Sequence, residues 1–140
     1  MRDVVDFLKN RFEREILAHH VIEPKAGTFA DFPDGLNPTL RQVLADGGIK
    51  ALYSHQAEAF GSISAGQDTV LVSQTASGKT LSFLLPILNE YMAAPAPFSV
   101  LLMYPTKALS RDQESTLGRL MLAAMNTHRL GTFDGDTPRE

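Results

Sequence analysis

A run of eight residues near the middle of the chain has the residue types and spacing of a phosphate-binding loop. Residues 73–80 read Ser-Gln-Thr-Ala-Ser-Gly-Lys-Thr. In such a loop, backbone amides and a helix N-terminus converge on a β-phosphate, the lysine reaches the β and γ oxygens, and the last hydroxyl binds magnesium. The pattern therefore predicts that Lys79 and Thr80 bind a triphosphate, with Thr80 as the Mg²⁺ ligand. The first position, Ser73, is normally glycine.

The residues on either side of this loop predict the strand and the helix that the motif requires. Residues 68–73 form a short run rich in β-branched residues that is typical of a buried strand, and residues 99–104 form a second, apolar strand candidate. Between them, apolar residues at spacings of three and four predict a helix with a kink at Pro86. These are Leu81, Leu84, Leu85, Leu88 and Met92. The pattern predicts a strand–helix–strand unit with a right-handed parallel crossover.

Further patterns extend this unit in both directions. Apolar residues at helical spacing predict an N-terminal amphipathic helix, and residues 22–38, rich in proline and glycine, read as a connector. Other helices are expected from Pro38 to Gly47, over 54–63 and over 109–124, and a third strand is expected at 129–133. The predicted fold class is α/β, with a parallel sheet flanked by helices and preceded by a helical extension. The N-terminal stripe consists of Val5, Leu8, Phe12 and Ile16.

Composition narrows the class of protein. A chain of 140 residues with 44% apolar and 21% charged residues is enough for one packed domain, or part of one. With 13 basic and 16 acidic residues the net charge is −3, so any contact with nucleic acid must be local. The lack of cysteine excludes disulfides and thiolate zinc sites, and the four histidines show no metal-ligand spacing. We expect a soluble cytoplasmic protein without a membrane segment, because early carboxylates interrupt any signal peptide.

Four elements, in order, resemble those of the superfamily 2 helicases with DExD/H boxes. Residues 52–56 are similar to their glutamine element, and residues 74–80 to their motif I. Residues 104–109, followed by Asp-Gln, resemble motif Ia. Residues 133–138 resemble the next element of one branch, the bacterial mitomycin-repair helicases and their fungal RecQ-like relatives. The resemblance covers residues 34 to 140. It implies that this part of the chain has a RecA-like ATP-binding fold.

The resemblance implies roles for particular residues. Gln56 would bind the adenine edge, and Tyr53 would pack on the base. The triphosphate would be held by the loop residues Thr75, Ala76, Ser77, Gly78, Lys79 and Thr80, of which Lys79 and Thr80 would be catalytic. Nucleic-acid phosphates would be contacted by the motif Ia residues Pro105, Thr106 and Lys107, and by Gly135. The implied ligands are ATP, Mg²⁺ and single-stranded DNA, with RNA left open.

Other expected helicase parts are not identifiable in the sequence. The family's Asp-Glu-x-His box and second RecA-like domain are expected after residue 140. Asp134 and Asp136 lack the preceding apolar strand of a metal-orienting carboxylate. We therefore expect 1–33 to be a helix and connector, and 34–140 the N-terminal part of the ATP-binding domain. Such a part is expected to be inactive alone, and its open apolar edge predicts marginal stability or self-association.

Two alternatives remain open from the residues alone. One is a small P-loop kinase or nucleotide-binding module, which usually needs an arginine-rich lid. The arginines after the loop are scattered rather than clustered: Arg111, Arg119, Arg129 and Arg139. The other is an inactive truncated remnant of a helicase.

Overall fold

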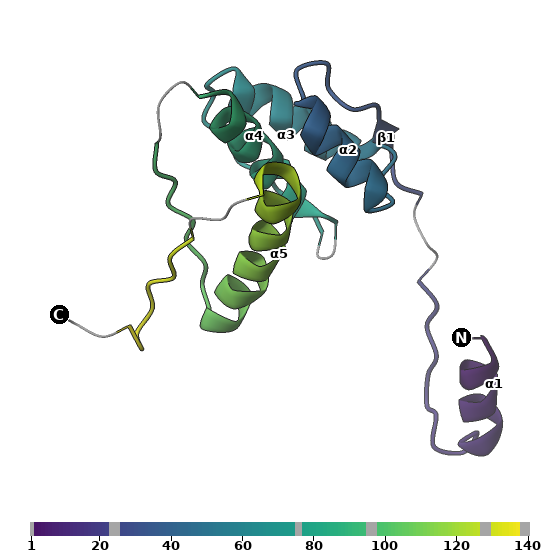
Figure 1. The fold of residues 1–140 in the computed structure, drawn as a ribbon. Helices are drawn as coiled ribbons and strands as arrows, with labels where there is room; N and C mark the ends of the chain where they lie inside the picture. The colour runs from purple at the N-terminus through teal and green to yellow at the C-terminus, as the bar shows by residue number, and fades with distance from the viewer. Residues whose placement is uncertain (1, 23–25, 75–76, 95–97, 127–129, 138–140) are drawn as a thin grey trace.

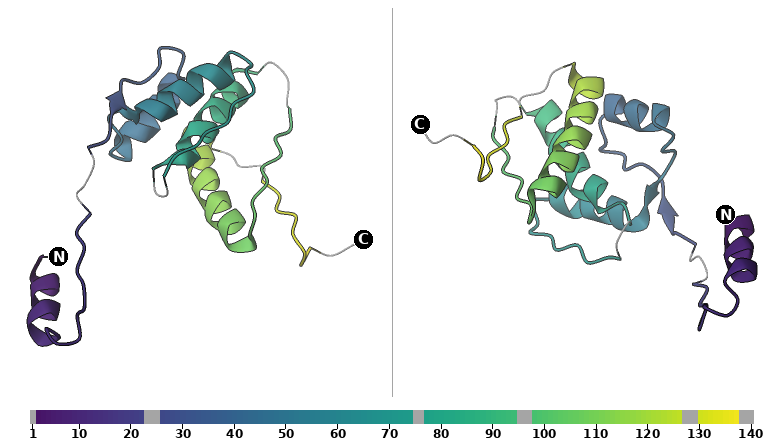
Figure 2. Two further views of the ribbon diagram at one scale, coloured as in Figure 1. Left: turned by 180° about the vertical axis from the view of Figure 1, so that it is seen from behind. Right: turned by 90° about the horizontal axis from the view of Figure 1, so that it is seen from below.

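The computed structural model describes residues 2–22, 26–74, 77–94, 98–126 and 130–137. In these ranges the chain forms five α-helices and two short β-strands. Four helices pack into one body: α2 (Pro38–Asp46), α3 (Ser54–Ser64), α4 (Lys79–Ala93) and α5 (Lys107–Met125). Figure 1 and Figure 2 show α1 (Arg2–Arg11) standing apart from this body. The four helices predicted after residue 38 are thus confirmed.

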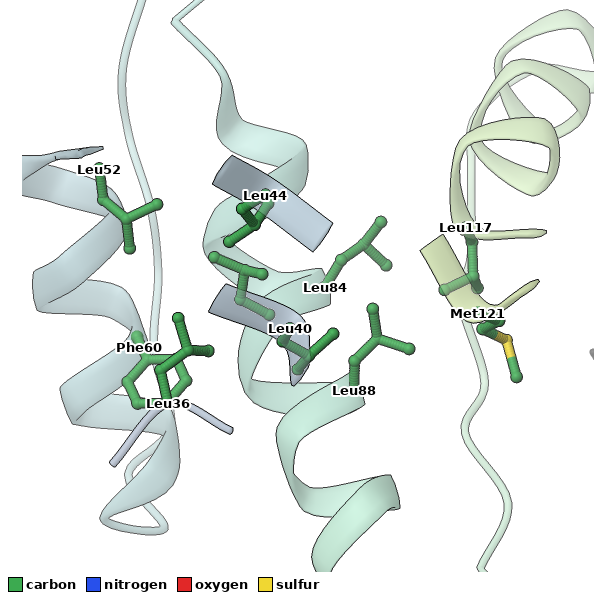
Figure 3. Packing of buried hydrophobic residues seen from close by; sticks show 10 residues of the cluster. Leu36, Leu40, Leu44, Leu52, Phe60, Leu84, Leu88, Leu117 and Met121 are labelled. Atoms are coloured by element: carbon green, nitrogen blue, oxygen red, sulfur yellow. The ribbon is translucent and has the colours of Figure 1, made fainter. Parts of the chain in front are cut away.

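The core is built from one apolar face of each packed helix. Leu84 and Leu88 of α4 lie between Leu40 and Leu44 of α2 and the α5 side chains (Figure 3). Helix α3 packs along α4 and contributes Phe60. The leucine spacing of three and four that predicted α4 is the spacing that buries these side chains. The remaining buried members of the cluster are Leu36, Leu52, Leu85, Leu117 and Met121.

Helix α2 begins with a side-chain cap at Asn37, just before the predicted first residue, Pro38. The Asn37 side chain accepts a hydrogen bond from the Thr39 amide at 2.8 Å, and Pro38 occupies the first helical position. Asn89 of α4 bridges this start, because its side chain accepts from Asn37 N at 2.7 Å and donates to Gly35 O at 3.1 Å. The start of α2 is therefore fixed to the second half of α4. Pro86 lies inside α4, and its kink stays a prediction.

The strands differ from those that the sequence predicted. β1 (Phe29–Ala30) and β2 (Leu52–Tyr53) form an antiparallel pair. The expected connector over 22–38 thus contains a short strand. Among the described residues, the runs 68–73, 99–104 and 130–133 are extended but form no backbone ladder, so the expectation of a parallel sheet is not met. The physical reason is that a strand needs a neighbour to take its hydrogen bonds, and no backbone hydrogen bond among the described residues joins these runs to another segment.

Several apolar side chains of these extended runs are open to solvent, whereas Leu102 and Leu130 pack against the core cluster. Val70 and Val72 are 89% and 88% exposed, and Leu101 and Met103 are nearly as open. Helix α1 likewise exposes Val4, and it ends at Arg11 rather than reaching Ile16. No helix among the described residues is long and apolar enough to cross a bilayer.

Candidate functional site

The predicted phosphate-binding loop ends at the N-terminus of α4, with the ammonium of Lys79 turned into the loop. This nitrogen donates to Ser73 O at 3.0 Å, Ser73 Oγ at 3.2 Å and Ser77 Oγ at 3.4 Å, and also to Gln74 O. The Ser73 and Ser77 hydroxyls lie 2.6 Å apart and bond to each other. The loop oxygens thus surround the ammonium group of Lys79. Thr75 and Ala76 lie outside the described residues.

Gly78 precedes α4 in a conformation that other residues avoid. Its φ is +76°, and a Cβ there would lie 2.7 Å from Gln56 Nε2. The same Cβ would lie 3.7 Å from Tyr53 Cδ2. The loop therefore turns into α4 directly against the two residues predicted to hold the base.

Gln56 connects the start of α3 to the loop. Its Oε1 accepts from Tyr53 N at 2.9 Å, and its Nε2 donates to Gly78 O at 2.8 Å. The side chain is only 3% exposed. Each end of the amide thus has one protein partner, with one lone pair and one hydrogen in reserve. Its role at an adenine edge stays a prediction.

Tyr53 belongs to a stack of three aromatic rings. Its ring centroid lies 4.8 Å from that of Phe29 and 5.6 Å from that of His55, at interplanar angles of 25° and 12°. The β1–β2 pairing places Phe29 opposite Tyr53, and a Cβ at Gly27 would lie 2.6 Å from Tyr53 Cε1. Phe29 is a residue that the sequence reasoning missed. No local signal in 22–38 could identify it, because the contact depends on strand pairing.

The predicted nucleic-acid contacts gather at the N-terminus of α5. Thr106 is the N-cap, and its Oγ1 accepts from Leu109 N at 3.3 Å. Pro105 and Lys107 on either side of it are exposed. A Cβ at Gly135 would lie 3.6 Å from Lys107 Nζ, so the segment after residue 133 lies against this turn. The structure thus brings Gly135 together with motif Ia.

The extended run 98–104 borders an open apolar groove of about 640 Å³ between α4 and α5. Tyr104 and Gln113 line it, and each has a buried polar atom without a hydrogen-bond partner among the described residues. Burial raises the pKa of the Tyr104 phenol above its usual value, because the phenolate would lose its hydration there. The groove is therefore a largely apolar surface beside motif Ia.

The residues at the loop fit a metal only in part. Thr80, the second residue of α4, supplies one half-buried hydroxyl. Within the described ranges no group of three or more His, Cys, Asp or Glu side chains is placed to hold a metal. Mg²⁺ requires six oxygen ligands and usually takes several from phosphates and water. A magnesium ion at Thr80 therefore depends on a bound triphosphate.

The lysine loop ahead of α4, with a glutamine and an aromatic residue against its last glycine, has the features of a P-loop nucleotide-binding domain. A family comparison makes this class more specific. The model of the DEAD/DEAH box helicases matches residues 53–140. The chain belongs to this family.

Similar proteins include the ATP-dependent helicase YprA of Bacillus subtilis, whose function is uncharacterised, with 36% identity over 118 residues. They also include the ATP-dependent helicase hrq1 of Schizosaccharomyces pombe, with 33% identity over 94 residues. These matches cover 84% and 66% of this chain, but 16% and 9% of the relatives. The resemblance to the mitomycin-repair and RecQ-like branch is thereby confirmed.

Solved structures agree with the sequence comparison. The DUF1998 helicase MrfA bound to DNA matches 84% of this chain with a TM-score of 0.75 at 35% identity. MrfA bound to DNA and AMPPNP matches 99% of it with a TM-score of 0.82 at 32% identity. The chain covers 16% and 19% of these two structures. Its fold is consistent with part of a RecA-like domain, and it spans less than a fifth of each relative.

Proposed function

We propose that this chain is the first ATP-binding segment of an ATP-dependent DNA helicase. In this proposal residues 1–33 are a helix and connector, and residues 34–140 are the N-terminal part of the RecA-like domain. The observation that carries it is the Lys79 ammonium, held among loop oxygens at the start of α4. The sequence contains no Asp-Glu-x-His box. Hydrolysis and strand separation are therefore proposed for the whole helicase, with cytoplasmic location still a prediction from the sequence.

Nucleotide binding would exchange one set of Lys79 partners for another. The ammonium has three protons, and loop oxygens now accept them. Phosphate oxygens are stronger, charged acceptors, so Lys79 would leave the loop carbonyls for the β and γ oxygens. The free amides at the start of α4 would bind the same phosphates together with Ser77 and Gly78. Thr80 would complete the Mg²⁺ shell, while Thr75 and Ala76 keep the roles that the motif implies.

Base binding is proposed for the aromatic stack and Gln56. The Tyr53 ring lies beside Gly78, the last residue of the loop before α4. A base stacked on this ring would therefore lie next to the loop that binds its phosphates. Gln56 has the reserve donor and acceptor that an adenine edge requires, although using them demands that the nearly buried amide be reached. Through its hydrogen bond to Gly78 O, Gln56 would then connect the bound base to the phosphate-binding loop.

Nucleic-acid binding is proposed for the exposed turn at residues 105–107 and for Gly135. The DNA in the MrfA structures supports this choice of ligand. The Thr106 hydroxyl, the Lys107 ammonium and the exposed backbone at Pro105 are groups that contact phosphates without reading sequence. Single-stranded DNA is the proposed ligand. Single-stranded RNA could make the same phosphate contacts.

Two separate substitutions test the proposal. A fluorescent ATP analogue with Mg²⁺ and a labelled single-stranded oligonucleotide are each titrated into wild type, Lys79→Ala and Lys107→Gln. Lys79→Ala should lose the nucleotide and keep the oligonucleotide, and Lys107→Gln should do the reverse. Equal binding of both ligands by all three proteins would refute the assigned sites.

The kinase alternative is not favoured. The family match and both helicase relatives point away from it. A small kinase would phosphorylate an acceptor without nucleic acid, whereas the proposed helicase segment binds an oligonucleotide.

A further inference from the structure

Lys107, proposed to bind phosphate, is already paired with a carboxylate. Its Nζ lies 2.5 Å from Asp136 Oδ2, although the two side chains are 46% and 70% exposed. This is the one ion pair within the described ranges. An exposed pair of this kind contributes little to stability. We therefore consider what the pair does to ligand binding at motif Ia.

The turn that carries Asp136 is organised by its own hydrogen bonds. The Asp134 side chain accepts from Asp136 N at 2.8 Å, and Thr137 Oγ1 accepts from Asp134 N at 2.9 Å. Thr137 N also donates to Asp134 O at 3.1 Å. Gly135 brings this turn close to the lysine stem. The Asp134 carboxylate is therefore used inside the turn, while that of Asp136 is presented to Lys107.

We propose that Asp136 competes with nucleic-acid phosphate for Lys107, so that the turn at 134–137 restrains strand binding. This inference rests on the proposed role of motif Ia. A carboxylate and a phosphate both accept hydrogen bonds from an ammonium, and both are favoured near the N-terminus of α5, where Lys107 is the first residue. A phosphate approaching Lys107 meets the negative charge of Asp136. The strand must therefore displace that carboxylate or accept its repulsion.

Asp136→Asn tests the competition, because it removes the charge and keeps the backbone amide that bonds to Asp134. Single-stranded oligonucleotide affinity should rise about 2- to 5-fold, the range that a surface ion pair supports. The salt dependence should also steepen by about 0.7 in log–log slope, because one more cation becomes available to the strand. Fluorescence anisotropy with a labelled oligothymidylate over a series of salt concentrations measures both quantities.

Two further variants give the inference its controls. Glu90→Gln removes the same charge from an exposed position on α4, so it corrects for the change in net charge. The double variant Lys107→Gln/Asp136→Asn has no ammonium for which carboxylate and phosphate could compete. Its oligonucleotide affinity should therefore equal that of Lys107→Gln. Circular dichroism and binding of the ATP analogue confirm that each variant is folded.

The sign of the effect decides between competition and simple positioning. If Asp136 only orients Lys107 for the strand, Asp136→Asn binds equally or more weakly, and the inference is overturned while motif Ia binding stands. A gain of the same size in Glu90→Gln also overturns it. If neither wild type nor Asp136→Asn binds the oligonucleotide while the ATP analogue binds, both the motif Ia proposal and this inference fail.

Discussion

Gly78→Ala perturbs the point where the loop, Gln56 and α4 meet. Two separate penalties apply there. Gly78 has a φ of +76°, a conformation that costs a residue with a Cβ about 1–2 kcal/mol. The new Cβ would also lie 2.7 Å from Gln56 Nε2, which must move and lose its bond to Gly78 O.

The second penalty follows from the burial of Gln56. A buried amide that loses its partner costs about 1–3 kcal/mol. Together the two penalties predict that Gly78→Ala lowers the free energy of unfolding by about 2–5 kcal/mol. Gly66→Ala is the matched control, because Gly66 has a φ of +73° but nothing within 4 Å of the added Cβ. Its expected loss is the backbone penalty alone, about 1–2 kcal/mol.

Urea denaturation followed by circular dichroism measures both losses at low protein concentration. A third comparison isolates the contact, because Gln56→Ala removes the atom that the Cβ would meet. In that background Gly78→Ala should cost no more than Gly66→Ala does in wild type. Equal losses for Gly78→Ala and Gly66→Ala in wild type would refute the contact between Gln56 and the loop.

Two further predictions concern the open side of the molecule. Because burial raises the pKa of Tyr104, the folded state holds the phenolic proton more tightly than the unfolded state, so stability should fall as the pH rises above about 10. Tyr104→Phe should reduce this alkaline loss, and an unchanged pH profile in urea melts would contradict it. Val70→Lys/Val72→Lys should weaken concentration-dependent self-association in sedimentation velocity, because it charges an exposed apolar run. Asp68→Lys, at the polar end of that run, should change it less.

The helices were predictable from the sequence because their signals are local. Leucine spacing marked α4, and Pro38 marked the start of α2. The lysine loop was equally visible, since its residues are consecutive. Such signals depend only on neighbours within one or two turns.

The strands and the contacts across the site were not predictable in the same way. The β-branched run at 68–73 and the apolar run at 99–104 have strand composition, but a strand also needs a partner that is distant in sequence. Phe29 reaches Tyr53 through the β1–β2 pairing, and Gln56 reaches Gly78 across 22 residues. Neither contact leaves a local pattern. The Lys107–Asp136 pair is of the same kind, since two separate turns must meet to form it.

The loop around Lys79 is proposed to bind a nucleoside triphosphate, and a direct titration tests this claim. Wild type and Lys79→Ala are titrated with a fluorescent ATP analogue and Mg²⁺, with Lys50→Ala as the control for loss of a lysine elsewhere. Saturable binding by wild type and Lys50→Ala, weakened about 10- to 100-fold in Lys79→Ala, is the predicted result, because the variant loses charged hydrogen bonds to phosphate. Equal affinity in all three proteins would contradict the claim.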